Sequence, residues 1–285
     1  MNSHAQAHLL SSAPNLTVFF IIILLISALL FPYSSASSME SFIYVGCSQI
    51  KYNPGSPYES NLNSILASLV NSASISTFNN FKISLPGSTP ADVVYGLFQC
   101  RGDLTNPQCH HCVANAVTRL TTFCVGTSAG ALQLDGCFVK YDNTSFLGAQ
   151  DKTVVSNKCG PSIGYDSDLL TRRDAVLAYL TGDGGGQYFR VGRSEEVQGM
   201  VQCVQDLSMN ECQDCLSEAI QRLKSECGSS DWGDMFLGKC YARYSAGRTG
   251  YYSSESGEQR HHRRRRWWFT VCAFTFSLLF VLMLF

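Results

Sequence analysis

The stretch CRGDLTNPQCHHC, residues 100–112, sets the cysteine spacing around which this chain is organised. Its cysteines are separated by eight and then two residues, and gaps of eleven and twelve residues lead to two further cysteines. The same four gaps return in the second half of the chain, and each copy has one more cysteine upstream. Such an internal repeat indicates two copies of one structural module. The copies contain Cys47, Cys100, Cys109, Cys112, Cys124 and Cys137, and then Cys159, Cys203, Cys212, Cys215, Cys227 and Cys240.

The residues that flank these cysteines repeat as well. FQCRGDL at 98–104 corresponds to VQCVQDL at 201–207, and GCFVKY at 136–141 corresponds to KCYARY at 239–244. An even number of cysteines at repeated spacing predicts a disulfide framework when the compartment is oxidising. The spacing alone leaves the pairing within each module open.

The N-terminus predicts such a compartment. An apolar run at residues 18–30 is followed by Pro32 and by the small residues 34–36. This order is typical of a secretory signal peptide, which we place at residues 1–36 with cleavage near Ala36. The segment before the apolar run has no Lys or Arg, so an uncleaved signal anchor is the alternative.

The C-terminus predicts attachment to a membrane. Residues 267–285 carry no charge, and at ~1.5 Å per residue they are long enough for the ~30 Å core of a bilayer as a transmembrane helix. Residues 249–266 then form a polar juxtamembrane linker that ends in four arginines. Small residues, a polar spacer and an apolar tail are also the layout of a lipid-anchor signal, which stays open as the second interpretation.

Charge excludes one class of partner. The formal net charge is −1, and four of the 21 basic residues lie in the arginine run at 263–266, so the modules themselves are mildly acidic. A nucleic-acid-binding protein usually has a basic patch or stripe. We therefore expect no nucleic-acid partner.

Hydrophobic periodicity predicts an α+β fold of two modules, at residues 40–145 and 155–248. In the first we expect strands at 42–47, 81–85, 93–100 and 132–141, a helix at 58–72 and a second helix before Cys124. Asn106 is the expected N-cap of that helix, with Pro107 at its first position. In the second we expect helices at 167–180 and 210–226 and strands at 197–204 and 236–244. The expected linker is 145–158.

The pair Cys109 and Cys112, with His110 and His111 between them, has two sharper interpretations. A Cys-x-x-Cys at a helix start can hold a reactive thiolate, and cysteine with histidine can bind zinc. The second module keeps the spacing without histidines, which favours structural disulfides. We therefore expect no catalytic residue, no metal ligand and no cofactor. The sequence Asn143-Thr-Ser145 predicts N-glycosylation at Asn143.

The Cys-x8-Cys-x2-Cys core with one cysteine upstream and two downstream resembles the ginkbilobin-2-like repeat family of plants, also called stress-antifungal or cysteine-rich repeat secretory domains. A signal peptide, two such repeats and a membrane segment without a kinase resemble the plasmodesmata-located subgroup. The phrase YGLFQCRGDL at 95–104 is similar to that subgroup in particular.

The resemblance implies a five-stranded antiparallel sheet with two helices on one face in each module. It also implies that the first cysteine pairs with the fifth, the second with the third and the fourth with the sixth. The implied bridges are Cys47–Cys124, Cys100–Cys109, Cys112–Cys137, Cys159–Cys227, Cys203–Cys212 and Cys215–Cys240.

For function, the resemblance implies a type I plasma-membrane protein at plasmodesmata that regulates cell-to-cell traffic by non-catalytic binding. Implied partners are cell-wall glycans, other ectodomains of the family, receptor-like kinases and viral movement proteins, with links to callose. The alternative is a secreted or lipid-anchored, lectin-like defence protein. The mannose contacts of the family's founder are replaced here, so its sugar site is not expected; the replacements are Ser48, Ala131 and Asp142, and Gly160, Asp234 and Ser245.

Overall fold

The computed structural model describes residues 38–164, 166–182 and 185–246. The predicted signal peptide at 1–36, the linker at 249–266 and the membrane segment at 267–285 lie outside the described residues. Within the described ranges, no helix combines the length and the apolar character needed to cross a bilayer.

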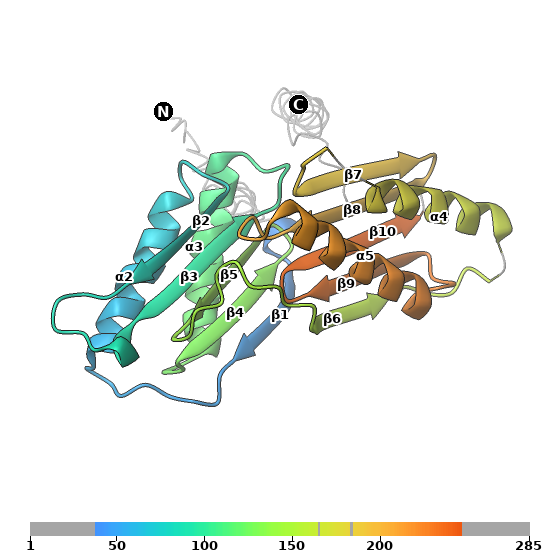
Figure 1. The fold of residues 1–285 in the computed structure, drawn as a ribbon. Helices are drawn as coiled ribbons and strands as arrows, with labels where there is room; N and C mark the ends of the chain where they lie inside the picture. The colour runs from blue at the N-terminus through green and yellow to red at the C-terminus, as the bar shows by residue number, and fades with distance from the viewer. Residues whose placement is uncertain (1–37, 165, 183–184, 247–285) are drawn as a thin grey trace, which may run out of the picture. The chain divides into compact units, whose positions relative to one another are not determined.

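The first module is a five-stranded antiparallel sheet with strand order β1-β4-β5-β3-β2. α2 joins β1 to β2 and α3 joins β3 to β4, and both helices lie together behind this sheet in Figure 1. The elements are η1 (Ser38–Glu40), β1 (Phe42–Cys47), α2 (Pro57–Ser72), β2 (Phe78–Ile83), η2 (Pro90–Asp92), β3 (Val94–Cys100), α3 (Asn106–Phe123), β4 (Ala129–Leu134) and β5 (Cys137–Asp142).

The second module repeats this topology with strand order β6-β9-β10-β8-β7. Its helices α4 and α5 lie together in front of their sheet in Figure 1. The elements are β6 (Val154–Cys159), α4 (Ser167–Thr181), β7 (Phe189–Ser194), β8 (Val197–Cys203), α5 (Met209–Glu226), β9 (Trp232–Leu237) and β10 (Cys240–Ala246). The predicted α+β architecture of two tandem modules is confirmed.

The core of each module lies between the sheet and its helices, because side chains alternate along a strand. In β3, Val94 and Phe98 pack in one cluster with Ile65 of α2, whereas Leu97 faces the opposite side of the sheet. Gly96 lets the helix approach closely, since a Cβ there would lie 3.1 Å from Ile65 Cδ1. Gly199 has the same position in the second module, where a Cβ would lie 2.7 Å from Leu180 Cδ1.

Several strand boundaries and the linker differ from the prediction, and two further strands are present. β2 begins at Phe78 rather than at residue 81, because its register is set by pairing with β3. β6 occupies residues that we expected in the linker, since it pairs with β9 although its own sequence, VVSNKC, is only weakly apolar. β7 was not predicted, because FRVGRS has two arginines and a glycine and pairing with β8 decides its conformation.

The predicted N-cap of α3 is wrong by one residue. Thr105 has extended backbone angles and caps the helix, so Asn106 is the first helical residue and Pro107 the second. Gln108 Oε1 accepts from the Thr105 backbone N–H at 2.9 Å and from Thr105 Oγ1 at 2.9 Å, which is half of a capping box. Thr105 is the N-cap because Gln108 stands three residues after it, whereas Asn106 has no such partner.

We expect Thr105→Ala to lower the free energy of unfolding by about 1 kcal/mol, because the helix loses its capping side chain. Asn106→Ala is the matched control and should change this free energy by less than about 0.5 kcal/mol. Urea unfolding followed by circular dichroism measures both. A larger loss in Asn106→Ala than in Thr105→Ala would contradict the assignment.

Candidate functional site

Six disulfide bonds tie helices to strands. The first bridge of each module joins the first strand to the end of the second helix, the second joins the third strand to the start of that helix, and the third joins that helix to the last strand. The pairs are those that the family resemblance implies: Cys47–Cys124, Cys100–Cys109, Cys112–Cys137, Cys159–Cys227, Cys203–Cys212 and Cys215–Cys240. α3 and α5 are thereby fixed on their sheets.

The Cys-x-x-Cys motif offers no thiolate in this arrangement. Cys109 and Cys112 are both buried and bridged, to β3 and β5 respectively. The Nε2 atom of His111 lies 2.6 Å from Glu40 Oε1 in the segment before β1. Among the residues that the structure describes, no three His, Cys, Asp or Glu side chains gather as a metal site requires.

The helix-free faces of the two sheets meet instead. Leu97 and Phe138 of the first sheet cluster with Phe146 and with Val204 of the second module. In the second sheet, Met200, Phe236 and Tyr241 form a cluster to which Ile43 of β1 and Val155 of β6 add. We call this contact the inter-module face. It buries apolar side chains from both copies of the repeat.

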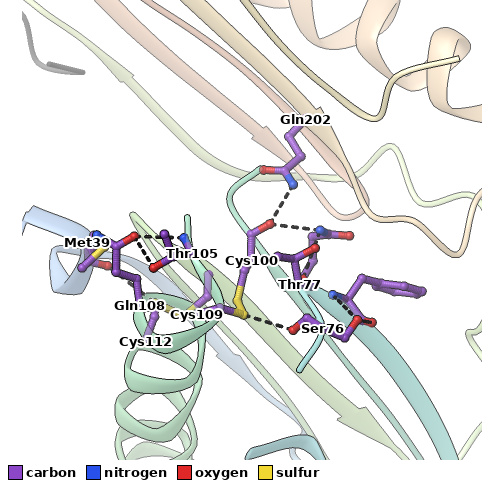
Figure 2. The surroundings of a disulfide bond; sticks show 12 residues. Met39, Ser76, Thr77, Cys100, Thr105, Gln108, Cys109, Cys112 and Gln202 are labelled. Carbon is purple, nitrogen blue, oxygen red and sulfur yellow. Dashed lines mark hydrogen bonds between the residues drawn. A yellow bond between two sulfur atoms is a disulfide. The ribbon is translucent and has the colours of Figure 1, made fainter. Parts of the chain in front are cut away.

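Two glutamines at equivalent repeat positions cross the inter-module face. Gln202 Nε2 donates to the Cys100 carbonyl at 2.9 Å, and Gln99 Oε1 accepts from the Gln205 backbone N–H at 3.0 Å. Figure 2 shows Gln202 above Cys100, whose sulfur is bridged to Cys109. Both glutamines are buried, so each satisfies a backbone group of the other module that would otherwise cost about 1–3 kcal/mol.

An ion-pair chain extends the inter-module face at one side. Arg243 Nε lies 2.7 Å from Asp234 Oδ1 within the second sheet, and its Nη1 lies 2.6 Å from Asp135 Oδ1 of the first module. Asp135 also accepts from Arg101, which pairs with Asp103. The Arg243 side chain is 1% exposed, so its charge depends on these carboxylates rather than on water.

A second polar cluster ties the connecting segment to the second module. Lys239 Nζ pairs with Asp206 and donates to the Phe146 carbonyl at 3.2 Å, and the Gly148 backbone N–H donates to Asp206 Oδ2 at 3.0 Å. The Lys239 ammonium lies 5.2 Å from the centroid of the Phe146 ring. Burial lowers the pKa of Lys239, and the hydrogen bond and charge of Asp206 oppose this shift.

The positions of the founder's mannose contacts have other roles here. Ser48 donates its backbone N–H to Ala129 O at 2.9 Å, and Asp142 Oδ1 accepts from the Thr144 backbone N–H at 2.9 Å. In the second module, Asp234 is taken up by the ion pair with Arg243. Ala131 and Gly160 have no side chain that could replace an arginine or a carboxamide as a sugar ligand, and Ser245 has a hydroxyl in place of a carboxylate.

Asn143 is exposed at the end of β5, next to the segment that crosses to the second module. The side chain therefore lies where an oligosaccharide has room.

The inter-module residues themselves were not singled out from the sequence. The sequence carries one signal for them: Gln99 and Gln202 each stand directly before a cysteine at the same place in the two repeats.

Comparisons with known proteins cover both modules. The salt stress response/antifungal family matches residues 46–144 and 158–247. Plasmodesmata-located protein 6 of Arabidopsis thaliana is 58% identical over 233 residues, which cover 81% of this chain and 78% of that protein. Plasmodesmata-located protein 7 of the same plant is 54% identical over 248 residues, covering 87% of this chain and 81% of that protein.

Solved structures agree with the fold. The crystal structure of the tandem DUF26 ectodomain of the Arabidopsis thaliana cysteine-rich receptor-like protein PDLP5 is 45% identical, with a TM-score of 0.68, and covers 73% of this chain and 100% of that one. Two cross-linked modules joined in tandem thus define a DUF26 ectodomain of the receptor-like or secreted type. The chain belongs to the salt stress response/antifungal family, and Arabidopsis plasmodesmata-located proteins are its homologues.

We expect Arg243→Met to lower the free energy of unfolding by about 3–5 kcal/mol, because Asp135 and Asp234 remain as buried carboxylates without this partner. Lys140→Met is the matched control, since Lys140 has the equivalent position in the first module and is only half-buried. It should cost less than about 1 kcal/mol. Denaturant unfolding of the purified protein measures both, and equal losses would contradict a special role of the inter-module face.

We expect Asn143→Gln to remove one N-linked oligosaccharide. The variant from a secretory host should migrate faster in gel electrophoresis than the unchanged protein, and endoglycosidase should no longer shift it. Ser145→Ala, which leaves the asparagine but breaks the acceptor sequence, should behave in the same way. If endoglycosidase does not shift the protein without a substitution, Asn143 is not glycosylated and the prediction is wrong.

Proposed function

We propose that this chain is a membrane-anchored extracellular protein of plasmodesmata that regulates cell-to-cell traffic by non-catalytic binding. The observation that carries the proposal is similarity to the plasmodesmata-located proteins along both modules, at 58% and 54% identity. Two plasmodesmata-located proteins thus match most of this chain rather than a single domain.

The proposed topology places both modules outside the cell. Residues 1–36 direct secretion and are removed, residues 249–266 form a polar linker, and residues 267–285 anchor the chain as a type I membrane protein. Twelve cysteines in six bridges support this placement, because such bridges persist in oxidising compartments and are rare in the cytosol.

The inter-module face constrains where partners bind. The cavity within it, which Gln99, Arg101, Asp135, Gln202 and Tyr241 help to line, has a volume of about 20 Å³. This is room for about one water molecule, so a sugar or a peptide cannot enter without separating the sheets. Binding would therefore use outward surfaces: the helices and the strand edges.

The proposed partners follow from this role. They are cell-wall glycans such as callose, other ectodomains of the family or of receptor-like kinases, and viral movement proteins that dock at the channel. Each is a binding event that requires no reacting group. Asp234, which takes the place of a founder sugar contact, is engaged by Arg243, and this supports binding of a different kind from the founder's mannose recognition.

A secreted or lipid-anchored defence protein is the second candidate. The description of the matched family, salt stress response/antifungal, favours it. Such a protein would be released from membranes by a phospholipase that cleaves lipid anchors, and it would bind glycans in solution. A transmembrane protein at plasmodesmata would remain in the membrane after the same treatment.

We expect a fluorescent protein inserted after Ser38 to appear as puncta across cell walls that coincide with callose staining. The insertion precedes Met39, the residue whose carbonyl binds the Gly136 backbone N–H at 2.9 Å, so the modules stay intact. Overexpression should also reduce the spread of a free fluorescent protein between neighbouring cells.

The control for this experiment carries the same insertion but ends at Gly257, which removes the proposed anchor. It should accumulate in the cell wall space without puncta. An even plasma-membrane signal from the full chain, together with unchanged spread of the fluorescent protein, would overturn the plasmodesmal proposal and favour the defence protein.

A further inference from the structure

One of the six bridges differs from the others in its exposure. Cys159 is exposed at the end of β6, whereas the eleven other bridged cysteines are buried or half-buried. Its partner Cys227 is buried and caps the end of α5. Because thiol–disulfide exchange needs access to one sulfur only, exposure of Cys159 opens this bridge to attack.

The equivalent bridge in the first module is protected. Cys47 packs against the core of that module together with Val45, which stands two residues before it. In the second module, Asn157 stands two residues before Cys159 and replaces this valine. The Asn157 side chain donates to the Glu226 carboxylate, and its Oδ1 lies 3.9 Å from both sulfurs of the bridge, so a polar group stands where the first module has an apolar one. An exposed polar residue beside Cys159 thus replaces a half-buried apolar one beside Cys47.

We propose that Cys159–Cys227 is a reducible disulfide, a modification site for an extracellular dithiol of the thioredoxin or disulfide-isomerase class. This site does not depend on the plasmodesmal role. It differs from the Cys-x-x-Cys motif of α3, whose sulfurs are buried. Here the chain is the substrate of a thiol exchange and not its catalyst.

The exchange proceeds in two balanced steps. A thiolate of the dithiol attacks Cys159 Sγ, the Cys159–Cys227 bond breaks, and Cys227 leaves as a thiolate that takes a proton from water. The second thiol of the dithiol, after losing its proton, attacks the mixed disulfide and releases Cys159 as a thiolate, which is protonated in turn. The dithiol is oxidised to a disulfide and the bridge is reduced by two electrons.

Reduction would free an edge of the second sheet. β6 is an outer strand that pairs only with β9, and none of its residues is buried. Cys159–Cys227 is the bridge that ties this strand to α5, while the other two bridges of the module hold β8 and β10. β6 also follows directly on the segment that carries Phe146 and Gly148. Reduction of Cys159–Cys227 would therefore release β6, the strand that follows the segment connecting the two modules.

The test is a time course of reduction. The full-length protein, in detergent, is exposed to low dithiothreitol, free thiols are trapped with N-ethylmaleimide, and the labelled cysteines are mapped by mass spectrometry. We expect Cys159 and Cys227 to be labelled at least about tenfold faster than Cys47 and Cys124, the matched control bridge. Equal rates for the two bridges, or faster labelling of any buried bridge, would overturn the proposal.

Reciprocal variants test the cause. Asn157→Val should slow labelling of Cys159, and Val45→Asn should speed labelling of Cys47, because each exchange moves the apolar cover from one module to the other. Hydrogen exchange should show faster exchange of the β6 amides after reduction, with α3 unchanged. If neither variant changes its rate although both keep the unchanged circular dichroism spectrum, the proposed protection by Val45 is wrong.

Discussion

A β-sheet with helices on only one face has a second face that must be covered by something else. In this chain each module covers that face with the other module, since Leu97 and Phe138 meet Val204, and Met200 and Tyr241 meet Ile43. The bridges decide which face is left over, because they fix α3 and α5 on the opposite side of their sheets. The tandem, rather than the single module, is therefore the unit that completes the burial of its apolar surface.

Equivalent positions of the two modules lie at the inter-module face, and the residues are the same at some of these positions and different at others. Gln99 and Gln202 keep the same residue and each serves the other module. Lys140 and Arg243 occupy a second equivalent pair, but Arg243 is buried in an ion pair that reaches Asp135, whereas the Lys140 ammonium lies over the Phe146 ring. The equivalent glutamines thus bond the other module in different ways, one as donor and one as acceptor, and the equivalent basic residues differ in their partners.

The cysteine framework, both pairs of helices and the antiparallel sheets follow from spacing, periodicity and the family resemblance. The sequence could not show the inter-module face, because a strand buried on both sides, such as β3 with its run VYGLFQC, has no alternation to reveal which residues face a neighbour. It could not show β7 either, since pairing with β8 holds two arginines in a strand. The N-cap at Thr105 rather than Asn106 depends on the Gln108 side chain and not on the propensity of one residue.

The ion pair between Arg243 and Asp135 has a consequence for how such tandems can change over evolutionary time. Asp135 presents a carboxylate at the turn before β5, and the equivalent place in the second module is Gly238. A chain built from two first modules would bring Lys140 to the place of Arg243 and Ala131 to that of Asp234. A chain built from two second modules would keep Asp234 but lack the Asp135 carboxylate that pairs with Arg243 across the inter-module face. The two copies are thus no longer interchangeable, because this ion pair needs one module of each kind.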